Sequence, residues 1–142
     1  MRVLVDTSVW SVALRRSGAL CPDDRTLVDE LHDLIDDVRV AMIGPIRQEL
    51  LSGISSQTQF DTLKEKLQAF DDIPLNRDVY EQAASFSNTC RRCGVQGSPT
   101  DLLICAVGAE MRMPIFTSDK DFAHYAKHLP IALHHPVSST GT

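Results

Sequence analysis

Four acidic side chains have positions that would let them share one metal ion. Taken singly, Glu49 could also be a solvated residue, and Asp101 and Asp119 could instead cap helices. Asp6 and Asp119 each follow a short apolar run. Glu49 comes shortly after a third apolar run, and Asp101 begins a strongly apolar segment. Carboxylates that leave water together repel one another and need a counter-charge. A divalent cation supplies that charge, oxygen ligands favour Mg²⁺ or Mn²⁺ over zinc, and such an ion in an open crevice suits the hydrolysis of phosphate esters.

Predicted strands and helices alternate along the chain, and this alternation places the four acids at one edge of a sheet. We expect an α/β fold, a three-layer α/β/α domain with a central parallel sheet. Ligands bind at the carboxyl ends of parallel strands. The predicted strands are 2–5, 38–43 and 113–117, with a brief strand within 71–75 and an edge strand at 130–133, and the predicted helices are 8–16, 23–37, 45–54, 57–70, 78–93 and 98–109.

Length and composition are typical of one globular domain. The chain has 142 residues, of which 43% are hydrophobic and 23% are charged. We expect one domain over residues 1–136, a flexible tail over 137–142, and a helical hairpin at about 45–70 that serves as a clip or a dimer surface. No apolar run approaches the roughly 20 residues that a membrane helix needs, and the N-terminus lacks a signal-peptide pattern. We therefore expect a cytoplasmic protein.

Charge and the remaining metal-ligand residue types add little. The net charge of −5 argues against a general basic surface for nucleic acid, although a carboxylate site is acidic by construction. Cys90 and Cys93 form a lone CxxC pair at the end of a predicted helix, so we interpret them as structural thiols. The acids of segment 23–37 fit the solvated face of an amphipathic helix. Two histidine pairs without a third nearby ligand are interpreted as solvated: His124 with His128, and His134 with His135.

Four short motifs, taken in order, resemble the PIN domain family and specifically the VapC-type toxins of bacterial and archaeal type II toxin–antitoxin pairs. The likeness runs from residue 1 to about residue 133. It implies that Asp6, Glu49, Asp101 and Asp119 hold Mg²⁺ or Mn²⁺, and that Asp121 assists or replaces Asp119. It also implies support from Thr7, Ser8 and Thr100. The motifs are Val5-Asp6-Thr7-Ser8, Arg47-Gln48-Glu49-Leu50, Pro99-Thr100-Asp101-Leu102 and Thr117-Ser118-Asp119-Lys120-Asp121-Phe122.

The same resemblance implies an endoribonuclease with RNA as its substrate. A metal-activated water would attack phosphorus and leave 5′-phosphate and 3′-hydroxyl ends. The family likeness also implies a homodimer and a cognate antitoxin that places an arginine against the acids, since a guanidinium can replace the charge of the metal. Basic residues that could contact phosphates, each of which could equally belong to a solvated helix face, are Arg15, Arg16, Lys64, Lys66, Arg91, Arg92 and Lys120.

Two alternatives stay open from the sequence. The first is a haloacid-dehalogenase-like phosphatase with Asp6 as nucleophile, but Ser8 stands where that chemistry needs a second acid. The second is a catalytically silent PIN-like binding module. Expression without an antitoxin distinguishes this module from a nuclease, because a nuclease is toxic and Asp6→Asn relieves the toxicity.

Overall fold

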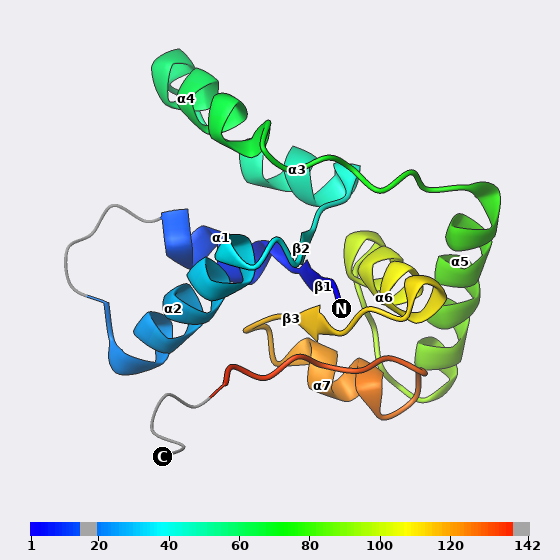
Figure 1. Ribbon diagram of the computed structural model, residues 1–142. Helices are drawn as coiled ribbons and strands as arrows, with labels where there is room; N and C mark the ends of the chain where they lie inside the picture. The colour runs from blue at the N-terminus through cyan, green and yellow to red at the C-terminus, as the bar shows by residue number, and fades with distance from the viewer. Residues whose placement is uncertain (15–19, 138–142) are drawn as a thin grey trace.

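A three-stranded parallel sheet forms the centre of the protein, as a computed structural model shows for residues 1–14 and 20–137 (Figure 1). The strands are β1 (Val3–Val5), β2 (Val40–Ala41) and β3 (Ile115–Phe116), in the order β2-β1-β3. β1 pairs with both neighbours in parallel. All three residues of β1 are fully buried, so the residue that follows β1 leaves the middle of the core.

Helices cover both faces of this sheet. α1 and α2 lie on one side and α5 and α6 on the other, so the predicted three-layer α/β/α class is confirmed (Figure 1). None of the helices in the described ranges is long and apolar enough to cross a lipid bilayer. The helices are α1 (Thr7–Leu14), α2 (Pro22–Asp36), α3 (Gly44–Leu51), α4 (Gln57–Leu67), α5 (Arg77–Arg92), α6 (Pro99–Met111) and α7 (Asp121–Ala126).

α6 is deeply buried and capped at its N-terminus. Its N-terminus is capped by Ser98, whose Oγ accepts a hydrogen bond of 3.1 Å from the backbone N–H of Asp101. Every residue from 102 to 108 is buried, because the helix packs on the sheet and under α5. At Gly108 a Cβ would come within 3.0 Å of the Ile115 side chain, so this glycine permits the close approach of α6 to β3. The start of α6 is thereby fixed relative to the ends of the strands.

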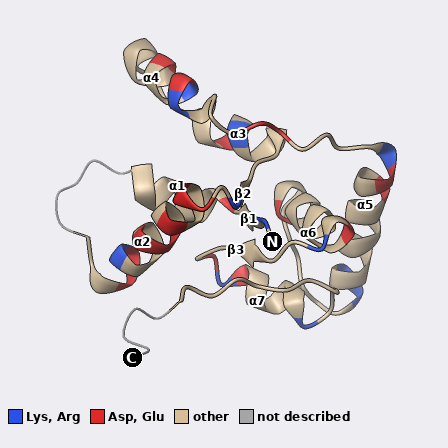
Figure 2. Cartoon of the chain, in the orientation of Figure 1, with Lys and Arg blue, Asp and Glu red and all other residues tan. Residues whose placement is uncertain are grey.

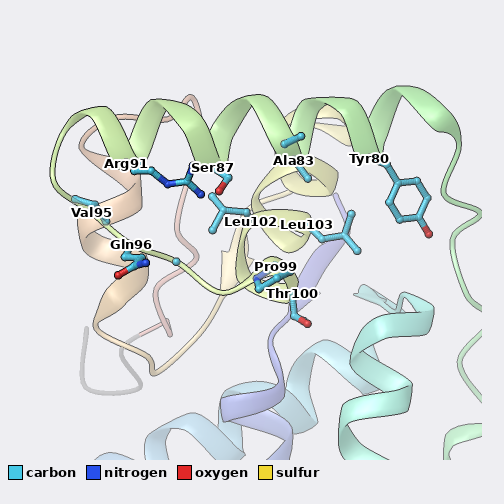
Figure 3. Close-up of a pocket in the computed structure, with 12 residues that line it drawn as sticks. Tyr80, Ala83, Ser87, Arg91, Val95, Gln96, Pro99, Thr100, Leu102 and Leu103 are labelled. Atoms are coloured by element: carbon cyan, nitrogen blue, oxygen red, sulfur yellow. The ribbon is translucent and has the colours of Figure 1, made fainter.

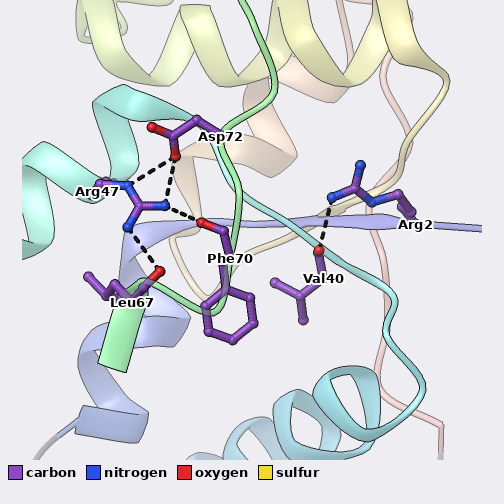
Figure 4. Close-up of polar contacts among 6 residues, drawn as sticks. All are labelled: Arg2, Val40, Arg47, Leu67, Phe70 and Asp72. Carbon is purple, nitrogen blue, oxygen red and sulfur yellow. Dashed lines mark hydrogen bonds and ion pairs between the residues drawn. The ribbon is translucent and has the colours of Figure 1, made fainter. Parts of the chain in front are cut away.

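Arg47 on α3 anchors the end of α4 (Figure 4). Its guanidinium donates hydrogen bonds to Asp72 Oδ1 at 3.0 and 2.9 Å and to the Leu67 carbonyl oxygen at 2.9 Å, and it also bonds the Phe70 carbonyl. These carbonyls belong to the last turn of α4 and the turn after it, where a cation is favoured. The rest of α4 extends away from the sheet (Figure 1). The two helices predicted at 45–70 are therefore present, and their role as a clip or dimer surface stays a prediction.

The strands are shorter than the apolar runs that predicted them. Val38 and Arg39 do not join β2, because their N–H groups bond the carbonyls of Ile35 and Leu34 and so close the end of α2. Val38 has a left-handed φ of 56° and is 85% exposed. The strands expected within 71–75 and at 130–133 are reduced to single bridges, Met42 to Asp72 and Ile115 to Leu133.

The interpretation of Glu30 and His134 as solvated residues is wrong. Acidic side chains recur along α2 (Figure 2), but Glu30 is only 6% exposed. Glu30 Oε2 lies 2.6 Å from His134 Nε2, and its Oε1 accepts a hydrogen bond of 3.3 Å from the Val137 backbone. His134 also packs edge-on against the Phe116 ring, with ring centroids 5.3 Å apart. This pair therefore ties the segment after residue 130 to α2 and to β3.

The remaining histidines and the cysteines agree with the sequence interpretation. His124, His128 and His135 are exposed. Cys90 is buried and Cys93 is exposed, both as free thiols, and burial raises the pKa of Cys90. A thiol with a raised pKa is a poor nucleophile, as expected for a structural residue. Arg15, Arg16 and residues 138–142 lie outside the described residues.

Candidate functional site: an acidic cluster at the ends of β1 and β3

Asp6 occupies the end of β1, where it is 5% exposed. Its Oδ2 accepts hydrogen bonds of 2.8 Å from the hydroxyls of Ser8 and Thr117. Its backbone N–H donates to the Phe116 carbonyl at 2.9 Å. Adjacent parallel strands end at the same edge of a sheet, and this geometry brings together residues 111 positions apart. The orientation of the Asp6 carboxylate is therefore fixed by both strands.

Hydroxyl groups extend this arrangement from Asp6 to the turn after β3. The backbone N–H of Asp119 donates to Thr117 Oγ1 at 3.0 Å, so one hydroxyl links Asp6 with Asp119. Asp119 Oδ1 in turn accepts a hydrogen bond of 2.9 Å from the backbone N–H of Asp121, which begins α7. Among the described residues, no side-chain donor forms a hydrogen bond to the carboxylate of Asp119 or of Asp121.

Asp101 reaches the same place from the first turn of α6. Its Oδ2 accepts a hydrogen bond of 2.8 Å from the hydroxyl of Tyr125, a residue that is 1% exposed. Burial raises the pKa of Asp101, the negative charges of Asp6 and Asp119 raise it further, and the Tyr125 hydrogen bond opposes the shift. The pKa rises because three carboxylates lie close together where water is partly excluded, so the charged form of Asp101 is disfavoured. The Tyr125 hydroxyl holds this carboxylate in place, and no positive charge from residues 1–14 or 20–137 pairs with it.

Three of the acids form a group with the spacing of metal ligands. Ligand oxygens of Asp101, Asp119 and Asp121 all lie within 4.8 Å of one another. Asp101 and Asp119 are partly buried and Asp121 is exposed. In the part of the chain that the structure describes, no Lys or Arg forms an ion pair with any of the three. An all-oxygen set that lacks a cation fits a hard divalent ion.

The other predicted site residues lie around this group. Asp6 is outside the three-acid group, although its charge acts on Asp101. Glu49 is exposed on α3 and is also outside the group. The buried Thr7 Oγ1 finds no hydrogen-bond partner among the described residues. Thr100 faces a groove on the other side of the start of α6.

Two residues that hold these acids were not predicted from the sequence. Thr117 was part of a motif but was given no role, and it bonds both Asp6 and Asp119. Tyr125 was not considered, and its hydroxyl bonds Asp101. A signal for Tyr125 was available, because a tyrosine three residues after the buried Phe122 lies on the apolar side of a short helix and needs a partner for its hydroxyl.

Comparison with known proteins defines the class to which this fold and site belong. Residues 3–128 match the PIN domain family, so the chain belongs to that family. This membership favours the PIN interpretation over the phosphatase alternative. Two similar proteins are "VapC ribonuclease Mb1587" of Mycobacterium bovis and "Ribonuclease VapC11" of Mycobacterium tuberculosis. Each is 28% identical over 123 residues, which cover 84% of this chain and 88% of the relative.

Solved structures of other proteins have the same fold. The chain superimposes on FitAcB from Neisseria gonorrhoeae with a TM-score of 0.74 and 21% identity, over 94% of this chain and 97% of the other. For VapBC2 from Rickettsia felis, described as bound to a DNA fragment from its promoter, the TM-score is 0.73 at 16% identity, over 94% and 98% of the two chains. At these identities the superpositions establish the shared fold.

Proposed function

We propose that the protein is a metal-dependent endoribonuclease and the toxin of a type II toxin–antitoxin pair. The observation that carries this proposal is a group of three carboxylates that has no cationic partner among the described residues, in a chain that belongs to the PIN domain family. The similarity to two relatives named VapC ribonucleases supports RNA as the substrate.

Asp101, Asp119 and Asp121 would hold the ion, with Asp6 and Glu49 completing an acidic site around it. We propose Mg²⁺, with Mn²⁺ as a substitute, because the ligands are all oxygen atoms. When bound, such an ion would polarise the phosphoryl group and stabilise the charge that develops on the leaving oxygen. Asp119 and Asp121 both belong to the three-acid group, so we assign a role to each.

The chain's own residues would prepare the site for a phosphate. Ser8 and Thr117 hold the Asp6 carboxylate in one orientation, and Tyr125 does the same for Asp101. Asp101 lies in the first turn of α6, and the positive end of the helix dipole there favours a phosphate. A side-chain nucleophile is not required, because water can attack phosphorus once the phosphate is in place.

The proposed partners follow from the same charges. A cognate antitoxin would place an arginine against the acids and so supply the missing positive charge. Two solved structures with this fold are described as a member of the VapBC family of toxin–antitoxin systems from Mycobacterium tuberculosis and as a toxin–antitoxin complex from Klebsiella pneumoniae. FitAB and VapBC2 are described with bound DNA fragments. For this chain we propose a homodimer that associates with an antitoxin and acts in the cytoplasm, where its RNA substrate is found.

Cleavage of total RNA by the purified, antitoxin-free protein tests the proposal. Reactions would contain Mg²⁺, Mn²⁺ or EDTA, and ends would be mapped by sequencing. We expect discrete cuts with either metal, none with EDTA, and none with Asp101→Asn. Asp78→Asn is a matched control, because Asp78 is an exposed acid in the first turn of α5, away from the cluster.

Two results would contradict the proposal. The first is metal-dependent cleavage that survives in Asp101→Asn at the wild-type rate, which would place the activity elsewhere or in a contaminant. The second is an absence of cleavage by folded protein that also binds no Mg²⁺ in a calorimetric titration, which would favour the silent binding module.

A further inference from the structure

A groove of about 570 Å³ lies between α5 and the segment that leads into α6 (Figure 3). Its floor is apolar and includes Ala83, Leu102 and Leu103. Hydroxyl and amide groups of Ser87, Gln96 and Thr100 also line it. This volume falls within the range of small-ligand pockets, and it can hold a nucleotide. The groove is thus a recess with an apolar base and a few polar groups at its sides.

The charge of the groove comes from Arg91. Arg91 and Tyr80 lie toward opposite ends of the groove in Figure 3. Of the described residues that line it, Arg91 alone is charged, and no carboxylate in the described ranges forms an ion pair with its guanidinium. Tyr80 is 54% exposed, a high value for an aromatic side chain. The groove therefore offers a free cation and an aromatic ring to a ligand.

The groove and the acidic cluster flank the same turn of α6. Thr100 lines the groove, and the next residue, Asp101, belongs to the cluster. Gly97 connects the two places, because a Cβ at Gly97 would come within 2.3 Å of Leu102 and 2.9 Å of the Tyr125 hydroxyl. That hydroxyl holds Asp101. A ligand that crosses the start of α6 would reach both the groove and the acids.

We propose that this groove binds one nucleotide of a single-stranded RNA substrate next to the phosphate that lies at the acidic cluster. The proposal rests on the ribonuclease function proposed above. The base lies on the apolar floor, Arg91 contacts a phosphate, and Tyr80 offers a stacking surface at the rim. Only an unpaired base can enter, so the groove selects single strands. Gln96 and Ser87 can hydrogen-bond the edge of the base and give a sequence preference.

The charge of Arg91 favours an RNA phosphate over a second copy of the chain as the occupant of the groove. In a two-fold interface the same surface contributes from both copies. Two copies joined through this groove would bury Arg91 against a lining that contains no acid among its described residues. An unpaired buried charge is costly, whereas an RNA phosphate pairs with it directly.

Binding of a short fluorescein-labelled single-stranded RNA of randomised sequence, measured by anisotropy in EDTA, tests the groove without catalysis. We expect Arg91→Gln to weaken binding about tenfold and to lower the salt dependence by about one phosphate contact. Ala84→Trp, a change at an exposed residue that partly fills the groove, should weaken binding by a similar factor. Arg112→Gln removes the same charge at the far end of α6 and should change affinity less than about twofold.

The outcomes separate this proposal from the ribonuclease itself. Equal affinities for Arg91→Gln and Arg112→Gln would overturn the groove assignment, even if the wild-type protein cleaves RNA with Mg²⁺. Weakened binding in both groove variants would support the groove, even if no cleavage is found. Sedimentation velocity of Ala84→Trp is the second readout. A shift in oligomeric state with unchanged RNA affinity would show an interface between copies and overturn the proposal.

Discussion

Asp6 and Glu30 are buried to nearly the same extent, 5% and 6% exposed, but their carboxylates have different partners. Glu30 lies 2.6 Å from the imidazole of His134, a group that can carry a positive charge. Asp6 is bonded by two hydroxyls, which stay neutral, and its charge acts on Asp101 nearby. The chain thus supplies a partner for Glu30 and leaves the charge at the strand ends uncompensated. This difference indicates that the strand ends around Asp6, and not the surroundings of Glu30, form the region that needs a ligand.

Neutralising each acid in turn tests whether Asp6 and Glu30 have different roles, and it has the largest expected effect. Asp6→Asn should reduce RNA cleavage about a thousandfold, because a site that loses one of its anions loses about 4 kcal/mol of transition-state stabilisation. Glu30→Gln should stay within about threefold of wild type when activity is corrected for folded protein. Initial rates on a mapped RNA site provide the measurement. Equal losses in the two variants would remove the distinction between the regions.

Removal of His134 tests the other half of the comparison. His134→Ala leaves Glu30 buried without its partner, so the free energy of unfolding should fall by about 3 kcal/mol. Urea denaturation followed by circular dichroism measures the change. His135→Ala is the matched control, because His135 is an exposed neighbour, and it should change stability by less than about 0.5 kcal/mol. Similar midpoints for both variants would show that the Glu30–His134 contact contributes little.

Thr117→Val isolates the hydroxyl that joins two acids of the candidate site. The substitution keeps the shape of the side chain and removes the bonds to Asp6 Oδ2 and to the Asp119 N–H. We expect kcat to fall about tenfold with little change in KM, the usual size of effect when a group that orients a metal ligand is lost. Thr117→Ser keeps the hydroxyl and should restore most of the activity. Failure of serine to do so would assign the effect to packing.

The smallest expected effect concerns stability and pH in metal-free protein. A pKa of Asp101 raised above its ordinary 3.8 means that the folded state holds this proton more tightly than the unfolded state. Stability is therefore lost as pH rises from about 3.8 through the raised pKa. Asp101→Asn removes this loss, and it should raise Tm at pH 7 by about 2 °C in EDTA. The gain should vanish at pH 3, where the carboxyl is protonated in both states.

Scanning fluorimetry between pH 3 and pH 8 measures this difference. Asp78→Asn again serves as the control, since Asp78 is exposed and lies outside the cluster. A stability advantage of Asp101→Asn that is the same at every pH would attribute it to something other than the charge of the carboxylate.

The positions that the sequence predicted well are those at the ends of strands. The apolar run before Asp6 predicted both β1 and the buried place of the acid that follows it. The apolar run before Asp119 likewise predicted β3 and an acid shortly after its end. The clustering of Asp101 with Asp119 was expected because both the α6 start and the β3 end lie at one sheet edge. For residues at the ends of strands, the local sequence pattern and the parallel topology of the sheet are enough to predict their position.

Contacts between distant segments could not be predicted in the same way. Glu30 and His134 are 104 positions apart, and no local pattern pairs them. A partial signal existed, since Glu30 stands three residues after Leu27 and four before Leu34, on the apolar stripe of α2. The contacts of Arg47 gave no local signal either, because two of its partners are backbone carbonyls, which carry no sequence signature, and its acidic partner Asp72 is 25 positions away. β2 begins at Val40 and not at Val38, because Val38 belongs to the turn that closes α2.

The sheet order β2-β1-β3 has a consequence for synthesis on the ribosome. β1 is made first, yet its second neighbour, β3, is made more than a hundred residues later. At about 5–20 residues per second, roughly 6 to 22 s separate the appearance of Asp6 from that of Thr117. A nascent chain that has emerged only as far as α5 contains Asp6 but none of Asp101, Asp119 and Asp121. Translation that stops before β3 therefore yields a fragment in which the acidic cluster cannot assemble.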